Sequence, residues 1–171
     1  MNFIIKRRPG QGCKGLLRTE YRVWPCNLGR SGQLAVKREG DGGTPFGRFI
    51  PKRVYYRSDR VARPQTVLPI RPIHPDDGWC DRPGDRNYNR PVTLPYPAST
   101  ERLWRDDSLY DIVVVLDYND LPRIQGRGSA IFMHIASADG APTEGCIALI
   151  SGDLRAVLRL MRPDGVIISA L

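Results

Sequence analysis

Short runs of β-branched, aliphatic and aromatic residues recur along the chain, and turn-forming residues separate them. Runs of this length and composition favour an extended backbone. The expected strands are Asn2 to Lys6, Leu34 to Arg38, Arg48 to Tyr56, Asp111 to Tyr118, Ala130 to Ala136 and Val166 to Ser169. The pattern predicts a mainly β fold of the β-rich α+β class, with one or two short helices.

One segment near the end of the chain has helical periodicity. Between Ser151 and Met161 the apolar residues fall on one face of a helix; they are Leu154, Val157, Leu158 and Met161. Ser151 or Gly152 can cap this helix, and Asp153 suits the positive end of its dipole. A weaker helix is expected from Thr100 to Arg105.

The segment from Pro64 to Pro97 is rich in proline and has few periodic apolar positions. We expect a long loop region over the sheet, and loops of this length in a compact domain tend to be functional or disordered. Trp79, Tyr88 and Asn89 could form a wall that binds a peptide. The alternative is that Trp79 and Tyr88 pin the loop to the core.

Composition agrees with a globular fold. With 171 residues, 41% of them hydrophobic, the chain can bury a core as one domain covering residues 1–171. The 15 prolines and 17 glycines are spread along the length, which indicates many turns between short segments.

The charge of the chain raises the question of a nucleic-acid partner. The formal net charge is +8, and the run from Lys52 to Arg57 interleaves basic and aromatic residues. The basic residues are nevertheless scattered, and no helix-turn-helix, zinc-finger or RNA-binding signature accompanies them. The solvated face of a strand explains Arg53, Arg57 and Arg60 equally well. We therefore expect no nucleic-acid partner, although a basic surface would attract an acidic peptide.

Cys146 and His134, twelve positions apart, have the clearest chemical potential. A thiolate attacks a carbonyl whereas a thiol barely does, so a catalytic cysteine needs an imidazole or a positive environment. Cys146 follows Gly145, where the backbone can approach a substrate and its N–H groups could receive an oxyanion. Free cysteine is also among the most often buried residue types, so packing is the alternative. A catalytic Cys146 with a low pKa would alkylate well below about pH 8.5, unlike a packed one.

His134, followed by the run Thr143 to Leu149, resembles the signature of the L,D-transpeptidase (YkuD) catalytic domain. In that family a histidine precedes a Ser/Thr-His-Gly-Cys motif. The upstream run Lys37 to Phe49 is similar to the family's Thr-Pro-x-Gly-x-Phe element. Further segments look like a compact proteobacterial branch of the same family: Gly78 to Asp81, Tyr88 to Arg90 and Leu103 to Asp111. The resemblance covers most of the chain.

The resemblance implies a YkuD-like mixed β-sandwich and a role for each motif residue. Cys146 would be the nucleophile, His134 the base, and the backbone around Gly145 and Cys146 the oxyanion site. It also implies a dyad, with the imidazole oriented by a backbone carbonyl near Ile135 rather than by a carboxylate. Thr143 is expected to contact the substrate.

Two residues depart from the family pattern. Glu144 stands where most members carry a histidine, and Ala148 where most carry an arginine. An ionised carboxylate beside Cys146 would raise the pKa of the thiol, so Glu144 either points to solvent or binds a substrate ammonium group. Another arginine of the chain could hold the charged groups of the substrate, because a guanidinium fork matches a carboxylate.

By resemblance, the enzyme would form an acyl-enzyme on Cys146 and release D-alanine from a peptidoglycan tetrapeptide. Transfer to an amine would make it an L,D-transpeptidase, and transfer to water an L,D-carboxypeptidase that trims stem peptides or muropeptides. Carbapenems are expected as covalent inhibitors, and no cofactor is expected. The alternative is a non-catalytic YkuD-like module that binds cell-wall peptide or anionic polymer.

The remaining signals concern the other cysteines and the location. Four cysteines could form two disulfides, but a nucleophilic Cys146 must stay free. No CxxC or HxxxH pair exists, so no metal site is expected, and a site made of His74, Cys80, His134 and Cys146 is a remote alternative. The first apolar stretch is too short for a signal peptide, and no membrane span is expected. As written, the chain is expected in the cytoplasm, or in the periplasm if it has been trimmed.

Overall fold

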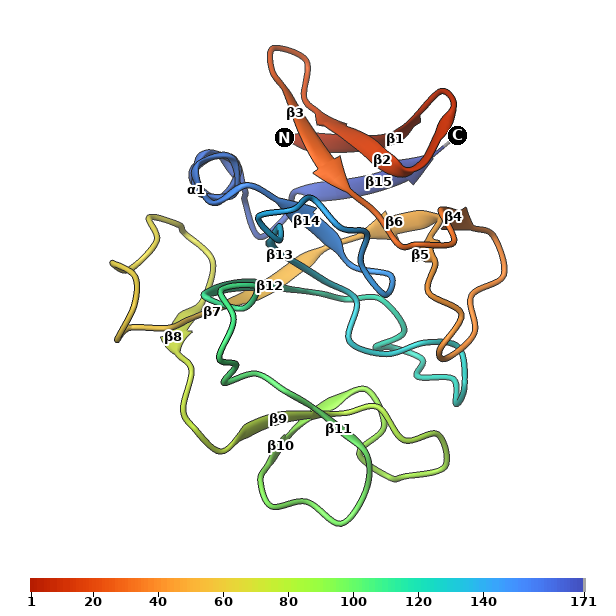
Figure 1. The fold of residues 1–171 in the computed structure, drawn as a ribbon, viewed down its shortest axis with the longest axis vertical. Coiled ribbons are helices and arrows are strands. Elements are labelled where there is room, and N and C mark those ends of the chain that lie inside the picture. Colours follow the sequence, from red (N-terminus) through yellow and green to blue (C-terminus); the bar gives the residue numbers. More distant parts are fainter. Residues whose placement is uncertain (171) are drawn as a thin grey trace.

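The computed structural model describes residues 1–170, and strands dominate this part of the chain (Figure 1). The prediction of a mainly β fold is therefore confirmed. The elements are β1 (Asn2–Arg8), β2 (Gln11–Arg18), β3 (Val23–Asn27), β4 (Gln33–Leu34), β5 (Thr44–Pro45), β6 (Gly47–Phe49), β7 (Pro51–Tyr56), β8 (Ile70–Pro72), β9 (Asp77–Cys80), β10 (Arg90–Thr93), β11 (Thr100–Arg102), β12 (Ile112–Leu116), β13 (Phe132–Ile135), β14 (Ile147–Leu149), α1 (Ser151–Leu160) and β15 (Val166–Ala170).

A ten-stranded mixed sheet forms the body of the molecule, in the order β6-β15-β1-β2-β3-β14-β13-β12-β7-β8. The pairs β1 with β15, β13 with β14 and β7 with β8 are parallel, and the other pairs are antiparallel. In Figure 1, β1, β2, β3 and β15 lie at the top, β12 and β7 cross below them, and α1 lies at one side. The parallel pair β13–β14 matters most for function, because its two strands carry the candidate chemistry.

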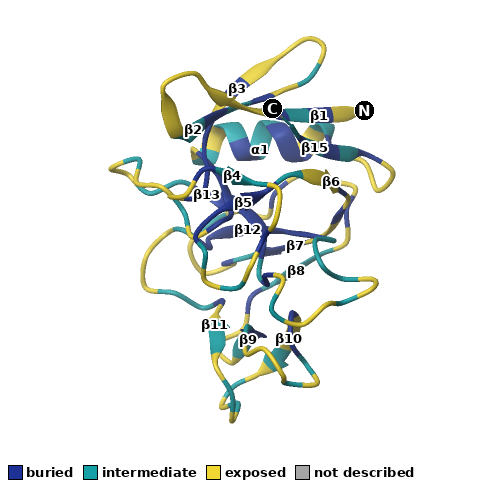
Figure 2. Cartoon of the chain, turned by 90° about the vertical axis from the view of Figure 1, so that its right-hand side faces the viewer, coloured by how far each residue is buried: buried dark blue, intermediate teal, exposed yellow. Residues whose placement is uncertain are grey.

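Side chains of the central strands alternate between two hydrophobic clusters. On β12, Ile112 and Val114 belong to the larger cluster, whereas Val113 and Val115 belong to the smaller one. Successive residues of a strand point to opposite faces, so one strand can serve both clusters. Figure 2 shows buried segments concentrated where α1 meets β12 and β13, and exposed ones at the outer loops. Tyr110 and Cys146 of the smaller cluster line the cavity described below.

A separate three-stranded sheet, β10-β9-β11, lies below the main sheet in Figure 1. The predicted helix from Thr100 to Arg105 is wrong, because Thr100–Arg102 forms β11 and pairs with β9. Pairing with β9 provides partners for the backbone N–H and C=O groups of this segment, and this outweighs its weak helical preference. The segment from Pro64 to Pro97 is likewise not only loop, since β8, β9 and β10 lie within it.

Two further strand predictions need correction. The strand expected from Leu34 to Arg38 is limited to β4, which ends at Leu34. The strand expected from Arg48 to Tyr56 is divided at Ile50 into β6 and β7, which pair with β15 and β12 respectively. The N–H of Ile50 donates to Asp117 Oδ1 at 2.7 Å, so a side chain takes the place of a ladder partner at this point. Strands β2, β3 and β14 were not predicted.

The predicted helix is confirmed as α1, one residue shorter than expected. Leu154, Val157 and Leu158 are buried on its inner face. The expected cap at Ser151 or Gly152 is not observed, because Ile150 is the N-cap residue and no side chain bonds there. Packing of the apolar face therefore stabilises this helix more than capping does.

Candidate active site

The parallel strands β13 and β14 bring the two candidate catalytic residues to one face of the sheet. His134 pairs with Ala148 in register, and Cys146 immediately precedes β14. The N–H of Phe132 donates to Cys146 Sγ at 3.3 Å, so Cys146 continues the pairing by one position. His134 lies two residues after Phe132 and shares its face, because side chains on a strand alternate. Residues twelve positions apart in the sequence thus become neighbours.

The turn before Cys146 is held against the upstream glycine-rich motif. Thr143 Oγ1 donates to the carbonyl of Cys146 at 2.6 Å, and Thr44 Oγ1 donates to the same carbonyl at 3.4 Å. Gly145 has φ +133°, and a Cβ built there would lie 2.8 Å from the carbonyl oxygen of Gly43. The two motifs noticed in the sequence are therefore in direct contact, and this contact requires glycine at position 145.

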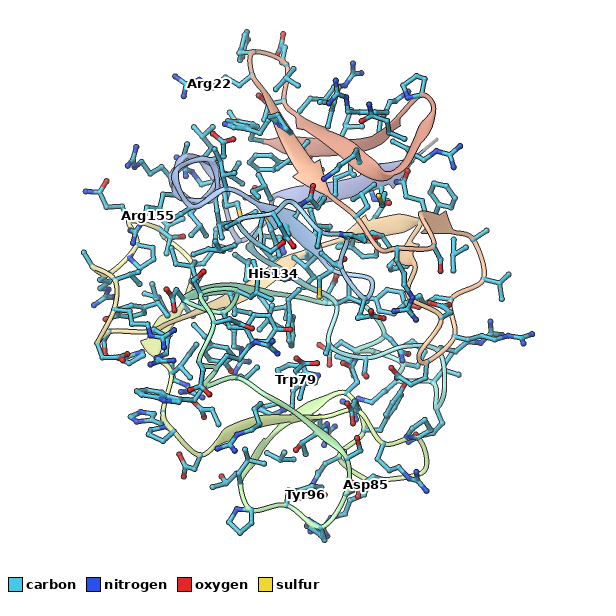
Figure 3. The ribbon with its side chains drawn as sticks, viewed as in Figure 1. Arg22, Trp79, Asp85, Tyr96, His134 and Arg155 are labelled. Carbon is cyan, nitrogen blue, oxygen red and sulfur yellow. The ribbon has the colours of Figure 1, made fainter. Side chains whose placement is uncertain are left out.

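The imidazole of His134 is oriented by the backbone, as predicted. Its Nδ1 lies 2.8 Å from the carbonyl oxygen of Ile135. A carbonyl only accepts, so Nδ1 carries the proton and Nε2 is left as the basic nitrogen. Tyr110 packs edge-on against the ring, with 5.3 Å between the ring centroids. Figure 3 shows His134 near the middle of the molecule, above Trp79 of the small sheet.

Cys146 and His134 open into one cavity of about 370 Å³. Residue Cys146 is 8% exposed, and its thiol donates to the carbonyl of Ala130 at 3.2 Å. Within residues 1–170 no hydrogen bond joins Cys146 Sγ to His134. The lining residues include Lys37, Glu39, Asp81, Glu101, Arg105, Tyr110, Thr143 and Glu144. Charged residues of both signs therefore line the cavity.

Burial keeps both candidate catalytic groups neutral. It raises the pKa of Cys146 to about 12, and the nearby Glu101 carboxylate adds to this effect. Burial also lowers the pKa of His134 to about 4, although the bond to Ile135 opposes the change. At neutral pH the pair is a thiol and a neutral imidazole. The low-pKa thiol expected from the sequence is therefore absent from the resting site.

Two cations of the cavity are candidates to replace the arginine missing at Ala148. Arg105 Nη2 lies 2.6 Å from Asp107, and Arg105 Nη1 lies 3.3 Å from Glu101. Lys37 is 5% exposed and pairs with Asp41. Both cations reach the cavity, and both already have a carboxylate partner. A substrate carboxylate would have to share them with these partners.

Glu144 does not act on the thiol in the way that was considered from the sequence. Its side chain is 76% exposed and forms an ion pair with Arg30. It lies at the wall of the cavity, so a contact with substrate stays a prediction. Thr143 also reaches the cavity, and its hydroxyl donates to the carbonyl of Cys146 and accepts from the N–H of Gly145 at 3.1 Å. The acid that opposes ionisation of Cys146 is Glu101.

Trp79, Tyr88 and Asn89 do not line this cavity. All three are buried, and Trp79 Nε1 donates to Asn89 Oδ1 at 2.9 Å. Asn89 Oδ1 also accepts from the N–H of Ala130 at 3.1 Å. The Tyr88 hydroxyl is hydrogen bonded to Glu39. These contacts agree with the alternative that the residues pin the segment to the core, and they place the group behind the cavity wall.

Sequence reasoning missed the residues that face Cys146 across the cavity, namely Glu101, Arg105 and Tyr110. Glu101 pairs in register with Trp79 on β9, and this pairing sets its position. The one local signal was the run of tryptophan and tyrosine residues before β12, which the family resemblance already included. Nothing in that run indicates that its side chains line the same cavity as Cys146.

The fold and the cavity define a β-rich domain with a buried histidine on one strand and a buried cysteine just before the parallel strand beside it. The chain belongs to the YkuD family, because the model of the L,D-transpeptidase catalytic domain matches residues 16–168. The resemblance seen in the sequence is therefore confirmed. Members of this family are generally L,D-transpeptidases that act on peptidoglycan peptides. No curated protein and no solved structure shows a significant match.

Three further observations concern residues 1–170. All four cysteines are free thiols. No three His, Cys, Asp or Glu side chains in this range are grouped so as to hold a metal ion. No helix in this range has the length and apolar character needed to span a bilayer.

Proposed function

We propose that the protein is a cysteine-dependent enzyme that cleaves the L-to-D peptide bond of peptidoglycan tetrapeptides through an acyl-enzyme on Cys146. The observation that carries the proposal is the shared cavity of Cys146 and His134, with the imidazole held by the Ile135 carbonyl at 2.8 Å. Orientation of the base by a backbone carbonyl leaves Nε2 unprotonated, as a general base requires.

The resting pair is neutral, so activation has to accompany attack. The thiol first turns from the carbonyl of Ala130 towards His134 Nε2. As sulfur bonds to the substrate carbonyl carbon, the thiol proton moves to Nε2. Forming the ion pair only in the transition state avoids a buried thiolate in the free enzyme, where burial opposes it.

The tetrahedral intermediate needs a donor for its oxyanion. The N–H of Gly145 already donates to Thr143 Oγ1 at 3.1 Å. The N–H of Cys146 donates to no atom of residues 1–170. Cys146 N–H is therefore the proposed oxyanion donor, and Gly145 serves to shape the turn. A single backbone donor of this kind contributes about 10²- to 10³-fold to the rate.

Breakdown of the intermediate completes acylation. The imidazolium of His134 gives its proton to the leaving nitrogen, D-alanine departs, and a thioester on Cys146 remains. An acceptor amine or water then attacks the thioester, and Nε2 takes the proton from the attacking group. Transfer to an amine is L,D-transpeptidation, and transfer to water is L,D-carboxypeptidation. Carbapenems would acylate the same sulfur.

The test is mass spectrometry of the protein incubated with a disaccharide tetrapeptide, with and without a D-amino acid. We expect a thioester adduct and loss of D-alanine. Exchange of the D-amino acid or a dimeric product would identify a transpeptidase, and a tripeptide product alone a carboxypeptidase. The Cys146→Ala variant should form neither adduct nor product. Cys13→Ala is the matched control and should behave as the wild type.

One observation favours a second candidate, a non-catalytic module that binds cell-wall peptide. In the resting structure Cys146 is buried, and its thiol is hydrogen bonded to the carbonyl of Ala130 rather than to His134. A binding module should hold the tetrapeptide without forming an adduct, and Cys146→Ala should bind it equally well. Turnover that depends on Cys146 would rule this candidate out.

A further inference from the structure

A second cavity, of about 320 Å³, lies between the small sheet and the β7–β12 end of the main sheet. Four basic side chains surround it: Lys52, Arg53, Arg90 and Arg123. The single acid in its wall is Asp120. Trp79 contributes to its apolar floor. This cavity is distinct from the one that contains Cys146.

The four cations come from three parts of the chain that only the fold brings together. Arg53 on β7 pairs with Val115 on β12. Arg90 begins β10 and pairs with Cys80 on β9. Arg123 lies in the segment that follows β12. A solvated strand face would explain Arg53 alone, but it does not explain convergence from three segments on one cavity.

These cations have almost no internal compensation. Lys52, Arg53 and Arg90 are exposed, and within residues 1–170 none of their three side chains forms a hydrogen bond or an ion pair. Arg123 is 14% exposed, and its nearest carboxylate, on Asp120, is 3.7 Å away. Arg123 Nε is buried without a hydrogen-bond partner in the described chain. A buried polar group without a partner is costly, so an external acceptor would stabilise it.

The other arginines near the small sheet show the contrast. Arg71 makes two hydrogen bonds with Asp77, at 2.7 and 2.9 Å. Arg105 is paired with Asp107 in the same way. Each of these two guanidinium groups is thus neutralised by a nearby aspartate of the same chain. Around the second cavity, four cations face one weakly placed acid.

We propose that this cavity binds a multiply charged oxyanion carried by a small molecule with an apolar face. Guanidinium forks match phosphate and carboxylate oxygens, and several converging cations favour a ligand with more than one negative charge. The floor at Trp79 suits a ring or other apolar part of the ligand. The proposal does not depend on the chemistry of Cys146.

Contacts through Trp79 and Phe132 connect the second cavity to Cys146 in the first. The ring of Trp79 packs edge-on against Phe132 at 5.1 Å between centroids, and the N–H of Phe132 donates to Cys146 Sγ. A ligand in the second cavity would therefore lie behind the reactive sulfur and not beside it. Binding can be measured without reference to turnover.

The experiment is isothermal titration calorimetry of the full chain with inorganic pyrophosphate and, separately, with citrate, at constant ionic strength. Arg123→Gln and the double variant Arg53→Gln/Arg90→Gln should each weaken binding at least about tenfold, the loss expected for one or more charge-assisted hydrogen bonds. Arg22→Gln is the control, because Figure 3 places Arg22 at the far end of the molecule. It should change the affinity less than about twofold.

The double variant guards against misfolding, because Arg53 and Arg90 are exposed and hold no partner. Its melting temperature without ligand should equal or exceed that of the wild type, since two repelling charges are removed. Preference for pyrophosphate would identify a phosphate ligand, and preference for citrate a polycarboxylate. The proposal fails if neither anion binds, if Arg22→Gln weakens binding equally, or if a single-stranded oligonucleotide binds at least about tenfold more tightly than either.

Discussion

The ring of Tyr110 stands edge-on to the imidazole of His134, at 5.3 Å between centroids and 71° between planes. The hydroxyl of Tyr110 donates to Glu101 at 3.2 Å, and the guanidinium of Arg105 lies 5.1 Å from the Tyr110 ring centre. The Ile135 carbonyl fixes one edge of the imidazole, and Tyr110 limits rotation of its plane. The base is thus held by a carbonyl and an aromatic ring.

Replacing Tyr110 should separate the role of its ring from that of its hydroxyl. Tyr110→Phe keeps the ring against His134, so we expect acylation to slow less than about threefold, in line with loss of one hydrogen bond worth about 0.5 kcal/mol. Tyr110→Leu keeps apolar volume but removes the ring, and acylation should fall more than about tenfold because the base is less well oriented. Single-turnover mass spectrometry measures both rates. Equal rates in the two variants would contradict the role of the ring.

Glu101 and Glu144 should differ in their effect on the thiol. The Glu101 carboxylate opposes ionisation of Cys146, in addition to burial. Glu101→Gln removes that charge, so the pKa of Cys146 should fall and its alkylation at about pH 9 should become faster by a few fold. Glu144 is exposed and paired with Arg30, so Glu144→Gln should leave the rate unchanged. Peptide mass spectrometry after timed iodoacetamide treatment reports the rate at Cys146 alone.

The acylation rate should fall at a lower pH than it would with an ordinary histidine as the base. Burial lowers the pKa of His134 to about 4, and the imidazole must be neutral to accept the thiol proton. Acylation should therefore persist from pH 7 down to about pH 5 and fall only near pH 4, instead of near the ordinary value of about 6.5. Acylation rates across this range, with short exposures to acid, give the profile. An inflection near pH 6.5 would show that His134 is more solvated than its burial indicates.

The same depressed pKa links His134 to stability. The folded protein keeps His134 neutral while the unfolded chain protonates it below about pH 6.5, so its contribution is complete above pH 6.5 and is lost as pH falls towards 4. The loss should approach about 3 kcal/mol by pH 4, from about 1.36 kcal/mol for each unit of pKa change. Urea unfolding of wild type and His134→Gln at several pH values isolates this term. The difference between the two proteins should shrink as the pH falls.

Gly145 should be intolerant of a side chain. Its φ of +133° disfavours other residues, and a Cβ would lie 2.8 Å from Gly43 oxygen. Gly145→Ala should lower the free energy of unfolding by about 1–3 kcal/mol and displace the turn before Cys146. Gly152 in α1 has open space around its Cβ position, so Gly152→Ala should be neutral or stabilising by up to about 1 kcal/mol. Chemical denaturation of both variants provides the comparison.

Local patterns in the sequence were sufficient for the fold class, the helix and the family. The runs of β-branched, aliphatic and aromatic residues and the apolar stripe of α1 carry their own signal, because strand and helix preferences depend on near neighbours. The motif around Cys146, with His134 upstream, was sufficient to indicate the family. Strands β2, β3 and β14 were not predicted because their local signal is weak: β2 contains glycines, β3 contains a proline and β14 is short. The helix expected from Thr100 to Arg105 failed because β9 offered a pairing partner.

Only the tertiary structure decided the state and surroundings of the catalytic pair. Burial sets the neutral thiol and the neutral imidazole, and burial depends on contacts between segments far apart in the chain. Register between β9 and β11 places Glu101, and Tyr110 reaches His134 from the segment before β12. The sequence alone determined which groups could react. Long-range strand pairing determined which charges and rings surround them, because such pairing has no local signature.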